Sequence, residues 1–267
     1  MMTVEDLIVL KKERTMSQVV EGWEEPFEVL RRKWGEVPTN TSATGRVSTV
    51  TLLDKSPAEL VAYWRSVTDP LFDDTSHETL MFPVDLYKDF LKDRKVLDIG
   101  AGLATMTLNF ALAGAHVTFV DIIEDNLKVL RKICEGFGIL DRVDFHYMRD
   151  VQSLTSLPCD FDVVTAMGSL HNAPIDVMRP EIQELYTHLK PGGRWLQLAY
   201  PRSRWEQEGA PPFSQWGVMT DGEGTPWAEW YDVDKLLSLF PENSMRVLFY
   251  AEWYKNAFNW FDFKRVE

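Results

Sequence analysis

The sequence predicts an α/β fold. We expect a doubly wound, mostly parallel sheet of seven strands that ends in an antiparallel hairpin, with a helical cap at the N-terminus. From residue 95 onward, short apolar runs alternate with helical segments, which is typical of a parallel sheet covered on both faces. Two runs near the C-terminus are joined by a short turn, as in a hairpin. A charged segment with a helical pattern precedes both regions.

The runs of strand length and the helical segments between them follow one another regularly. The parallel strands are expected at Lys95–Ile99, His116–Asp121, Asp144–Tyr147, Phe161–Met167 and Gly193–Ala199. Helices are expected between them at Thr105–Ala113, Glu124–Phe137 and Ile175–Leu189, and a last helix at 233–240. The hairpin strands are then Met245–Trp253 and Ala257–Val266.

The N-terminal region predicts further helices. Residues 4–34 look helical, and 35–48 have the composition of a loop. Ser56 with Pro57 and Glu59 forms a helix-start signature, and another helix is expected near 84–91. We therefore divide the chain into a cap segment, residues 1–83, and an α/β domain, residues 84–267, with an insertion at about 200–231.

Composition limits the classes of partner. The chain has 267 residues, a formal net charge of −13 and no long basic run, which argues against a nucleic-acid partner. The two cysteines, Cys134 and Cys159, are too few for a disulfide framework and favour a reducing, cytoplasmic setting. The N-terminus does not resemble a secretory signal, and no apolar window is long enough for a membrane span.

The first predicted strand runs into a glycine-containing turn and then a helix, over residues 96–105. Gly100 and Gly102 let the chain turn tightly and let a ligand approach the backbone. Thr105 stands where the dinucleotide-binding fingerprint has its third glycine. Asp98 would repel a pyrophosphate but attract an ammonium or sulfonium group, and S-adenosylmethionine carries both. Taken alone, Asp98 could instead cap the following helix.

These residues resemble motif I of the class I S-adenosylmethionine-dependent methyltransferases, read here as Asp98-x-Gly100-x-Gly102-x-Ala104 with alanine at the third glycine position. The resemblance covers roughly residues 84–200 and implies a Rossmann-like fold. It implies that Asp121 accepts from the ribose hydroxyls, that Asp150 accepts from the adenine amino group and that Val151 packs on the adenine ring. The cofactor-binding residues implied in full are Asp98, Gly100, Gly102, Asp121, Ile122, Asp150, Val151 and Met167.

His171 is the candidate catalytic base, because it follows the fourth predicted strand and titrates near neutrality. The alternative is that His171 only lines the pocket or orients the substrate. A metal ion is not expected, since Asp176 is the single carboxylate in the run that follows His171.

The insertion is rich in aromatic residues that suit flat rings, sugars or cations. The candidate substrate-binding residues are Trp64, Arg202, Trp205, Trp216 and Trp230. The alternative is that the tryptophans are core residues and the arginines are solvated.

The function these observations favour is methyl transfer from S-adenosylmethionine to a small-molecule oxygen acceptor, leaving S-adenosylhomocysteine. The acceptor could be a sugar, a nucleotide-linked sugar or a secondary metabolite, and the protein a monomer or a homodimer. Alternatives are N-methylation of a small amine, a protein or RNA methyltransferase, and a non-catalytic, cofactor-binding regulatory protein. Asp98 and Thr105 disfavour a nicotinamide oxidoreductase.

Overall fold

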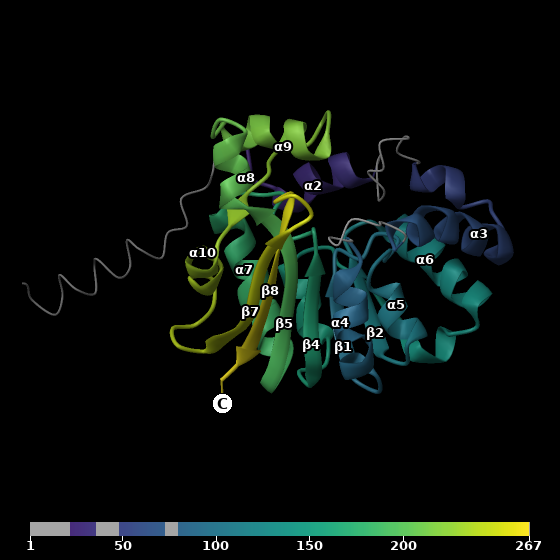
Figure 1. The fold of residues 1–267 in the computed structure, drawn as a ribbon. Coiled ribbons are helices and arrows are strands. Elements are labelled where there is room, and N and C mark those ends of the chain that lie inside the picture. Colours follow the sequence, from purple (N-terminus) through teal and green to yellow (C-terminus); the bar gives the residue numbers. More distant parts are fainter. Residues whose placement is uncertain (1–21, 36–47, 73–79, 267) are drawn as a thin grey trace, which may run out of the picture.

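A computed structural model describes residues 22–35, 48–72 and 80–266, and the fold is a three-layer α/β arrangement (Figure 1). The strands are β1 (Lys95–Ile99), β2 (His116–Asp121), β3 (Val143–Tyr147), β4 (Phe161–Met167), β5 (Leu189–Pro201), β6 (Trp230–Tyr231), β7 (Met245–Trp253) and β8 (Phe258–Arg265). The α-helices are α2 (Pro26–Trp34), α3 (Pro57–Thr68), α4 (Phe82–Leu91), α5 (Leu108–Leu112), α6 (Glu124–Phe137), α7 (Ile175–His188), α8 (Arg202–Gln207), α9 (Phe213–Asp221) and α10 (Val233–Leu237). Short 3-10 helices are η1 (Thr49–Leu52), η2 (Asp69–Leu71), η3 (Leu140–Arg142) and η4 (Val151–Ser156).

The strand order confirms the predicted doubly wound sheet. The sheet has 8 strands, in the order β3-β2-β1-β4-β5-β8-β7, with β6 paired to β5 outside this path. β1 to β5 are parallel neighbours, whereas β8 pairs antiparallel with both β5 and β7. The seven-strand prediction missed β6, whose two residues lie inside the insertion. The order reverses between β1 and β4, and ligands of open α/β sheets bind at such a switch point.

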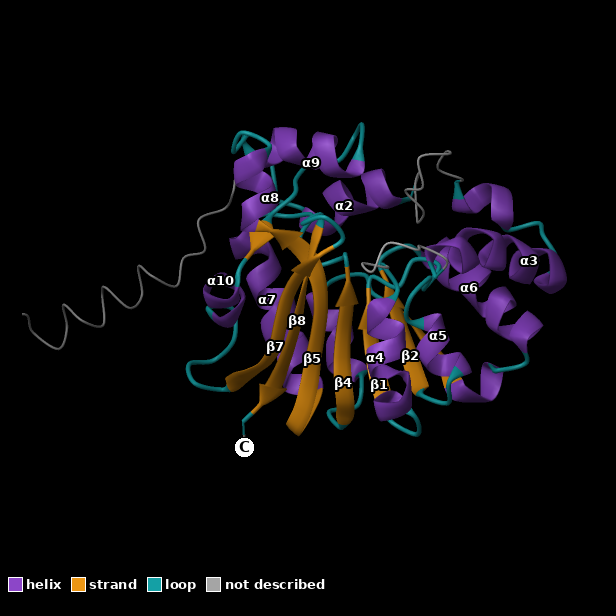
Figure 2. Cartoon of the chain, in the orientation of Figure 1, coloured by secondary structure: helices purple, strands orange, loops and turns teal. Residues whose placement is uncertain are grey.

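Helices pack on both faces of the sheet (Figure 2). Alternation along each strand separates the two faces. In β1, Val96 joins the core built by α3 to α6, and Leu97 joins the core built by α2, α7 and α10. In Figure 1, α2 and α9 lie above the carboxyl ends of β4 and β5. Helix α2 of the cap and helix α9 of the insertion therefore cover the edge at which a ligand would bind.

One expected helix boundary was wrong. The helix expected from Thr105 begins at Leu108, because Ala104 adopts a left-handed φ of 49° and the turn continues beyond it. The insertion folds into α8, α9 and β6 around its own small aromatic core. Most of the helix expected over 4–34 lies outside the described residues, and α2 is its described part.

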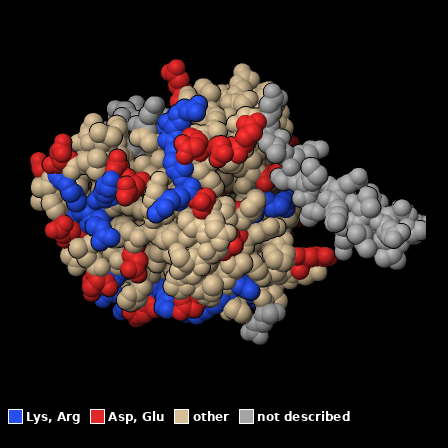
Figure 3. Space-filling view, turned by 180° about the vertical axis from the view of Figure 1, so that it is seen from behind, with Lys and Arg blue, Asp and Glu red and all other residues tan. Residues whose placement is uncertain are grey.

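Charges are mixed on the face of the molecule that is turned away from the viewer in Figure 1. Figure 3 shows Lys and Arg side chains lying beside Asp and Glu side chains on that face. Within residues 22–35, 48–72 and 80–266, no helix combines the length and apolar character needed to cross a bilayer. In the same ranges, no group of three or more His, Cys, Asp or Glu side chains is arranged to hold a metal ion.

Candidate active site

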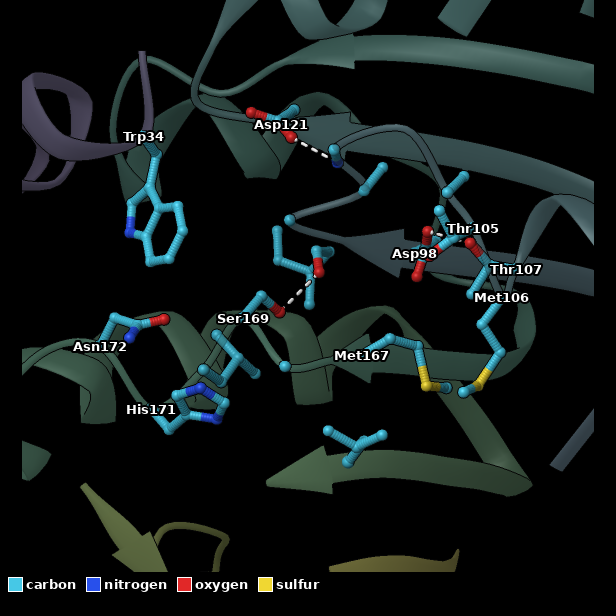
Figure 4. A pocket seen from close by; sticks show the side chains of 18 of the residues that line it. Trp34, Asp98, Thr105, Met106, Thr107, Asp121, Met167, Ser169, His171 and Asn172 are labelled. Carbon is cyan, nitrogen blue, oxygen red and sulfur yellow. Dashed lines mark hydrogen bonds between the residues drawn. The ribbon is translucent and has the colours of Figure 1, made fainter. Parts of the chain in front are cut away.

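A cavity of about 290 Å³ opens at the carboxyl ends of β1, β2 and β4. The glycine turn after β1 forms one wall, and Phe27, Leu30 and Trp34 of α2 line the cavity as well. In Figure 4, Asp98 and Asp121 lie on the side of the glycine turn and His171 with Asn172 at another end, with Ser169 and Met167 between them. The cavity thus joins the predicted cofactor residues to the predicted base.

The glycine turn is built as the sequence predicts. Gly100 has φ +69°, and a Cβ added there would lie 2.3 Å from the Ser169 Cβ. That contact is too short for any side chain, so the turn and the loop after β4 approach each other through glycine. Ser169 Oγ also donates to the Ile99 carbonyl at 2.7 Å. The alanine that replaces the third motif glycine, Ala104, adopts the left-handed conformation that favours glycine.

Asp98 is buried and lines the cavity. Its Oδ2 accepts from the Thr107 hydroxyl and its Oδ1 from the Thr165 hydroxyl, both at 2.7 Å. Burial raises the pKa of Asp98 to about 7, although both hydroxyls oppose the rise. A carboxylate held in this way gains from a positively charged ligand, since such a charge would stabilise its ionised form.

Asp121 is held by the backbone of the cavity wall. Its Oδ2 accepts from the Gly102 amide and its Oδ1 from the Ile123 amide, both at 2.7 Å. Asn126 donates to the same Oδ2 at 3.3 Å, and the Thr49 hydroxyl donates to the Asn126 amide oxygen at 2.8 Å. Burial raises the pKa of Asp121, while the backbone amides oppose the rise. The chain from Thr49 to Asp121 links η1 of the cap to the site.

The helix α2 closes the side of the cavity near β2 and β3. Arg31 Nε donates to the Ile122 carbonyl at 3.2 Å, and its Nη2 donates to the carbonyls of Met148 and Arg149. Ile122 lines the cavity, whereas Asp150 and Val151 do not. Asp150 is exposed and caps η4 by accepting from the Ser153 amide at 2.8 Å.

His171 is buried and lines the cavity, and its ring centroid lies 4.4 Å from that of Tyr200. Among the described residues, its Nδ1 has no hydrogen-bond partner. Burial lowers the pKa of His171 to about 4, so the imidazole is neutral at physiological pH. Beside it, Tyr200 donates to Asp221 Oδ1 at 2.8 Å and Asn172 donates to Asp221 Oδ2 at 3.3 Å.

Known proteins resemble this chain over the region that contains the glycine turn and His171. A family described as "Methyltransferase domain" matches residues 96–193. The ubiquinone biosynthesis O-methyltransferase of Bordetella bronchiseptica is 34% identical over 84 residues, 32% of this chain and 34% of that protein. The demethylmenaquinone methyltransferase of Clavibacter sepedonicus is 38% identical over 103 residues, 38% of each chain. The matched region thus spans between 34% and 38% of the length of these relatives.

Residues 96–193 of this chain carry a methyltransferase domain. Solved structures agree in fold. Magnesium protoporphyrin IX methyltransferase from Synechocystis, solved with bound S-adenosylhomocysteine, is 15% identical and covers 97% of this chain and 100% of its own, with a TM-score of 0.54. The [4+2]-cyclase SpnF, also 15% identical, covers 79% of this chain and 97% of its own, with a TM-score of 0.54. At this identity both likenesses show the fold alone.

The methyltransferase domain brings most of the predicted cofactor residues together. Asp98, Gly100, Gly102, Asp121, Ile122 and Met167 line one cavity with His171. Asp150 and Val151 lie at the neighbouring loop, outside the lining.

The five predicted substrate-binding residues are not among the described residues that line this cavity. Trp64 is buried in the core, and its Nε1 donates to the Leu103 carbonyl at 3.0 Å, which braces the glycine turn. Trp216 is fully buried, and Trp205 and Trp230 pack against the same small core. Arg202 is exposed and pairs with Glu206 at 2.8 Å. These side chains are already held by the protein, which matches the alternative that they are structural.

Several residues that line the methyltransferase cavity were not predicted. They come from the cap, from α6, from α7 and from the insertion, and include Trp34, Met81, Asn126, Glu181, Tyr200 and Asp221. The aromatic content of the insertion predicted that its tryptophans bind substrate. The cavity is lined instead by Asp221, at the end of helix α9 of the insertion.

Proposed function

We propose that this protein transfers the methyl group of S-adenosylmethionine to a hydroxyl group of a small-molecule acceptor. The observation that carries the proposal is a cavity that joins Asp98 and Asp121 to the Nδ1 of His171, which has no hydrogen-bond partner among the described residues. The two ends of this cavity differ in chemistry. One is acidic and bordered by a glycine turn, as a cationic adenosine derivative requires, and the other holds a neutral imidazole.

The residues at the first end fit the cofactor. Asp98 suits the ammonium group, because its carboxylate is buried and has no basic partner among the hydrogen bonds it makes. Asp121 suits the ribose, since a carboxylate has about four acceptor positions and its amide bonds leave room for a hydroxyl. Gly100 and Gly102 suit close approach of the backbone, and Ile122 and Met167 supply apolar contacts. Asp150 and Val151 remain proposed adenine contacts. They follow the loop whose carbonyl groups accept hydrogen bonds from Arg31.

The cofactor supplies an activated methyl group, so the protein has to align the acceptor and keep water away. Part of the cavity lining is apolar and helps to keep water away from the reacting groups. It is formed by Leu80, Met81, Leu198 and Phe258. His171 accepts a hydrogen bond from the acceptor hydroxyl and takes its proton as the oxygen gains the methyl group. Tyr200 keeps its own proton, because burial raises its pKa well above the usual value, and it holds the imidazole by ring contact.

Oxygen is favoured over nitrogen as the accepting atom because a base candidate lines the cavity, and a hydroxyl benefits from a base more than an amine does. The curated relatives include ubiquinone biosynthesis O-methyltransferases, which is consistent with this choice. N-methylation of a small amine stays the alternative. We further propose a cytoplasmic monomer or homodimer without a nucleic-acid partner, and a domain of residues 84–267 behind a cap of residues 1–83.

A two-stage experiment tests the proposal. Calorimetry with S-adenosylhomocysteine should show binding to the wild type and strongly reduced binding to Asp98→Asn. Radiolabelled S-adenosylmethionine should then transfer its label to members of a panel of small hydroxyl compounds. Binding without transfer to any member would favour a non-catalytic protein, a relevant alternative because a cyclase shares this fold. Absence of binding would refute the proposal.

A further inference from the structure

Glu181 of α7 is a buried carboxyl group that the reaction described above does not use. Its relative exposure is 6%, and it lines the same cavity as Asp98 and His171. Neither of its oxygens makes a hydrogen bond or an ion pair with any described residue, whereas Asp98, Asp121 and Asp221 all accept hydrogen bonds. Burial raises the pKa of Glu181 to about 7, and no basic group opposes the rise. A carboxyl group in this position is costly to ionise unless a ligand partners it.

The other acidic side chains of the lining already have partners. Asp98 accepts hydrogen bonds from two hydroxyl groups, and Asp121 accepts hydrogen bonds from two backbone amides. Asp221 accepts from Tyr200, Asn172 and Thr220. Among the carboxyl groups of the described lining, Glu181 is therefore the one that makes no hydrogen bond with the protein, and neither the cofactor residues nor His171 use it.

The described lining is rich in carboxyl groups and holds no basic side chain except His171. Asp98, Asp121, Glu181 and Asp221 contribute to it, and the described lining residues include no Lys or Arg. With Asp98 and Asp121 assigned to the cofactor, a phosphate or carboxylate on the acceptor would meet Glu181 and Asp221 without a Lys or Arg in the described lining to offset their charge. A protonated amine would be attracted, and apolar neighbours such as Met178, one turn earlier on α7, would strengthen that attraction by excluding water.

We propose that Glu181 binds a protonated amine on the acceptor, so that the substrate is a small hydroxyl compound carrying a positive charge. The inference rests on the proposed function and narrows it, because it removes nucleotide-linked sugars from the acceptor classes. The amine is the group that is recognised, and the hydroxyl remains the group that is methylated.

Three phenols of similar size test the preference for charge. Tyramine carries an ammonium group, 4-ethylphenol is neutral and 4-hydroxyphenylacetate carries a carboxylate. Calorimetry at pH 8 with saturating S-adenosylhomocysteine measures the Kd of each. We expect tyramine to bind at least about tenfold more tightly than the other two, as one partly desolvated ion pair allows. Equal affinities, tighter binding of the neutral or acidic phenol, or no binding of any of the three would overturn the inference.

Substitution of Glu181 assigns the preference to this side chain. Glu181→Gln keeps the shape and should lose the preference for tyramine while keeping its affinity for 4-ethylphenol. Glu184→Gln makes the same chemical change one turn later on α7, at a residue that bridges to His188 and is absent from the described lining, and should keep the preference. Retention of the preference in Glu181→Gln would overturn the inference.

The Kd for S-adenosylhomocysteine separates the two proposals. A protein that binds the cofactor product but shows no charge preference refutes the role of Glu181 alone. A protein that does not bind the cofactor product refutes the proposed function itself.

Discussion

At the scale of the residue, Asp98 shows how burial tunes a carboxyl group for a cationic ligand. Two hydroxyl groups fix its oxygens, and the protein offers it no counter-charge among its hydrogen bonds. The carboxyl group is consequently close to half ionised near neutrality, and a bound ammonium group would complete its ionisation.

Cofactor affinity should therefore depend on pH through Asp98. Its pKa of about 7 means that the neutral form grows as the pH falls below 7, and a neutral carboxyl group attracts an ammonium group weakly. The Kd for S-adenosylhomocysteine should rise by up to about tenfold per pH unit between pH 7 and pH 5. Asp98→Asn should bind at least about thirtyfold more weakly at pH 8 and lose this dependence. Titration calorimetry measures both, and a variant with wild-type affinity would contradict the assignment.

His171 should govern turnover rather than cofactor binding. Its Nδ1 has no hydrogen-bond partner in the described part of the chain, and its lowered pKa of about 4 keeps the ring neutral. His171→Ala should lower kcat by about a hundredfold, in the range expected for a general base, with the Kd for S-adenosylhomocysteine unchanged. Because protonation of His171 occurs only toward pH 4, its contribution to kcat should stay constant from pH 8 to pH 6. Near-normal turnover in the variant would leave His171 a lining residue.

At the scale of the element, the glycine turn depends on helices that the sequence did not assign to it. Trp64 of α3 donates to the Leu103 carbonyl, and Thr49 of η1 holds Asn126 beside Asp121. The cap is thus bonded to both cofactor-facing segments.

Trp64→Phe should weaken cofactor binding without unfolding the protein. The change keeps an aromatic ring in the core but removes the indole N–H, which leaves the Leu103 carbonyl without that partner. Loss of one such hydrogen bond costs about 1 kcal/mol, so the Kd for S-adenosylhomocysteine should rise about fivefold. Trp205→Phe is the matched control, because its indole donates to Pro211 in the insertion instead. An equal effect of both changes would contradict the assignment to the turn.

The elements divide sharply by how well the sequence predicted them. The strands from β1 to β4 and the hairpin followed from local apolar runs and turns, and their bounds agree within a residue or two. The late start of α5 did not, because only the left-handed conformation of Ala104 reveals it. The packing of the insertion also could not be predicted from its local sequence. A tryptophan pattern is the same for a binding platform and for a core, and tertiary contacts alone decide between them.

At the scale of the whole molecule, the site is assembled from segments far apart in the chain. Glu181 lies on α7, Trp34 on α2 and Asp221 on α9, and none of them stands near a motif that the sequence offers. The motif residues were predictable because cofactor chemistry fixes their spacing. The acceptor side was not, since its residues meet only when the cap and the insertion fold over the sheet.

The buried Glu181 should also limit the stability of the whole protein at alkaline pH. Its pKa is about 7 in the folded state against 4.5 as the reference value, so the folded state holds the proton more tightly. The corresponding stability is present below pH 4.5 and is lost as the pH rises through 7. Its full size is on the order of 3 kcal/mol. Glu181→Gln cannot ionise and keeps this stability at every pH.

Urea unfolding at pH 5 and at pH 8.5 measures the effect, because every other titrating group contributes equally to the wild type and to the variant. The variant should be the more stable protein at pH 8.5 by up to about 3 kcal/mol relative to the difference at pH 5. A difference that is the same at both pH values would mean that Glu181 finds a partner on folding. That outcome would contradict the inference that Glu181 is free to bind a cation. A pH-dependent difference would instead support an ionisable Glu181 without a partner in the protein.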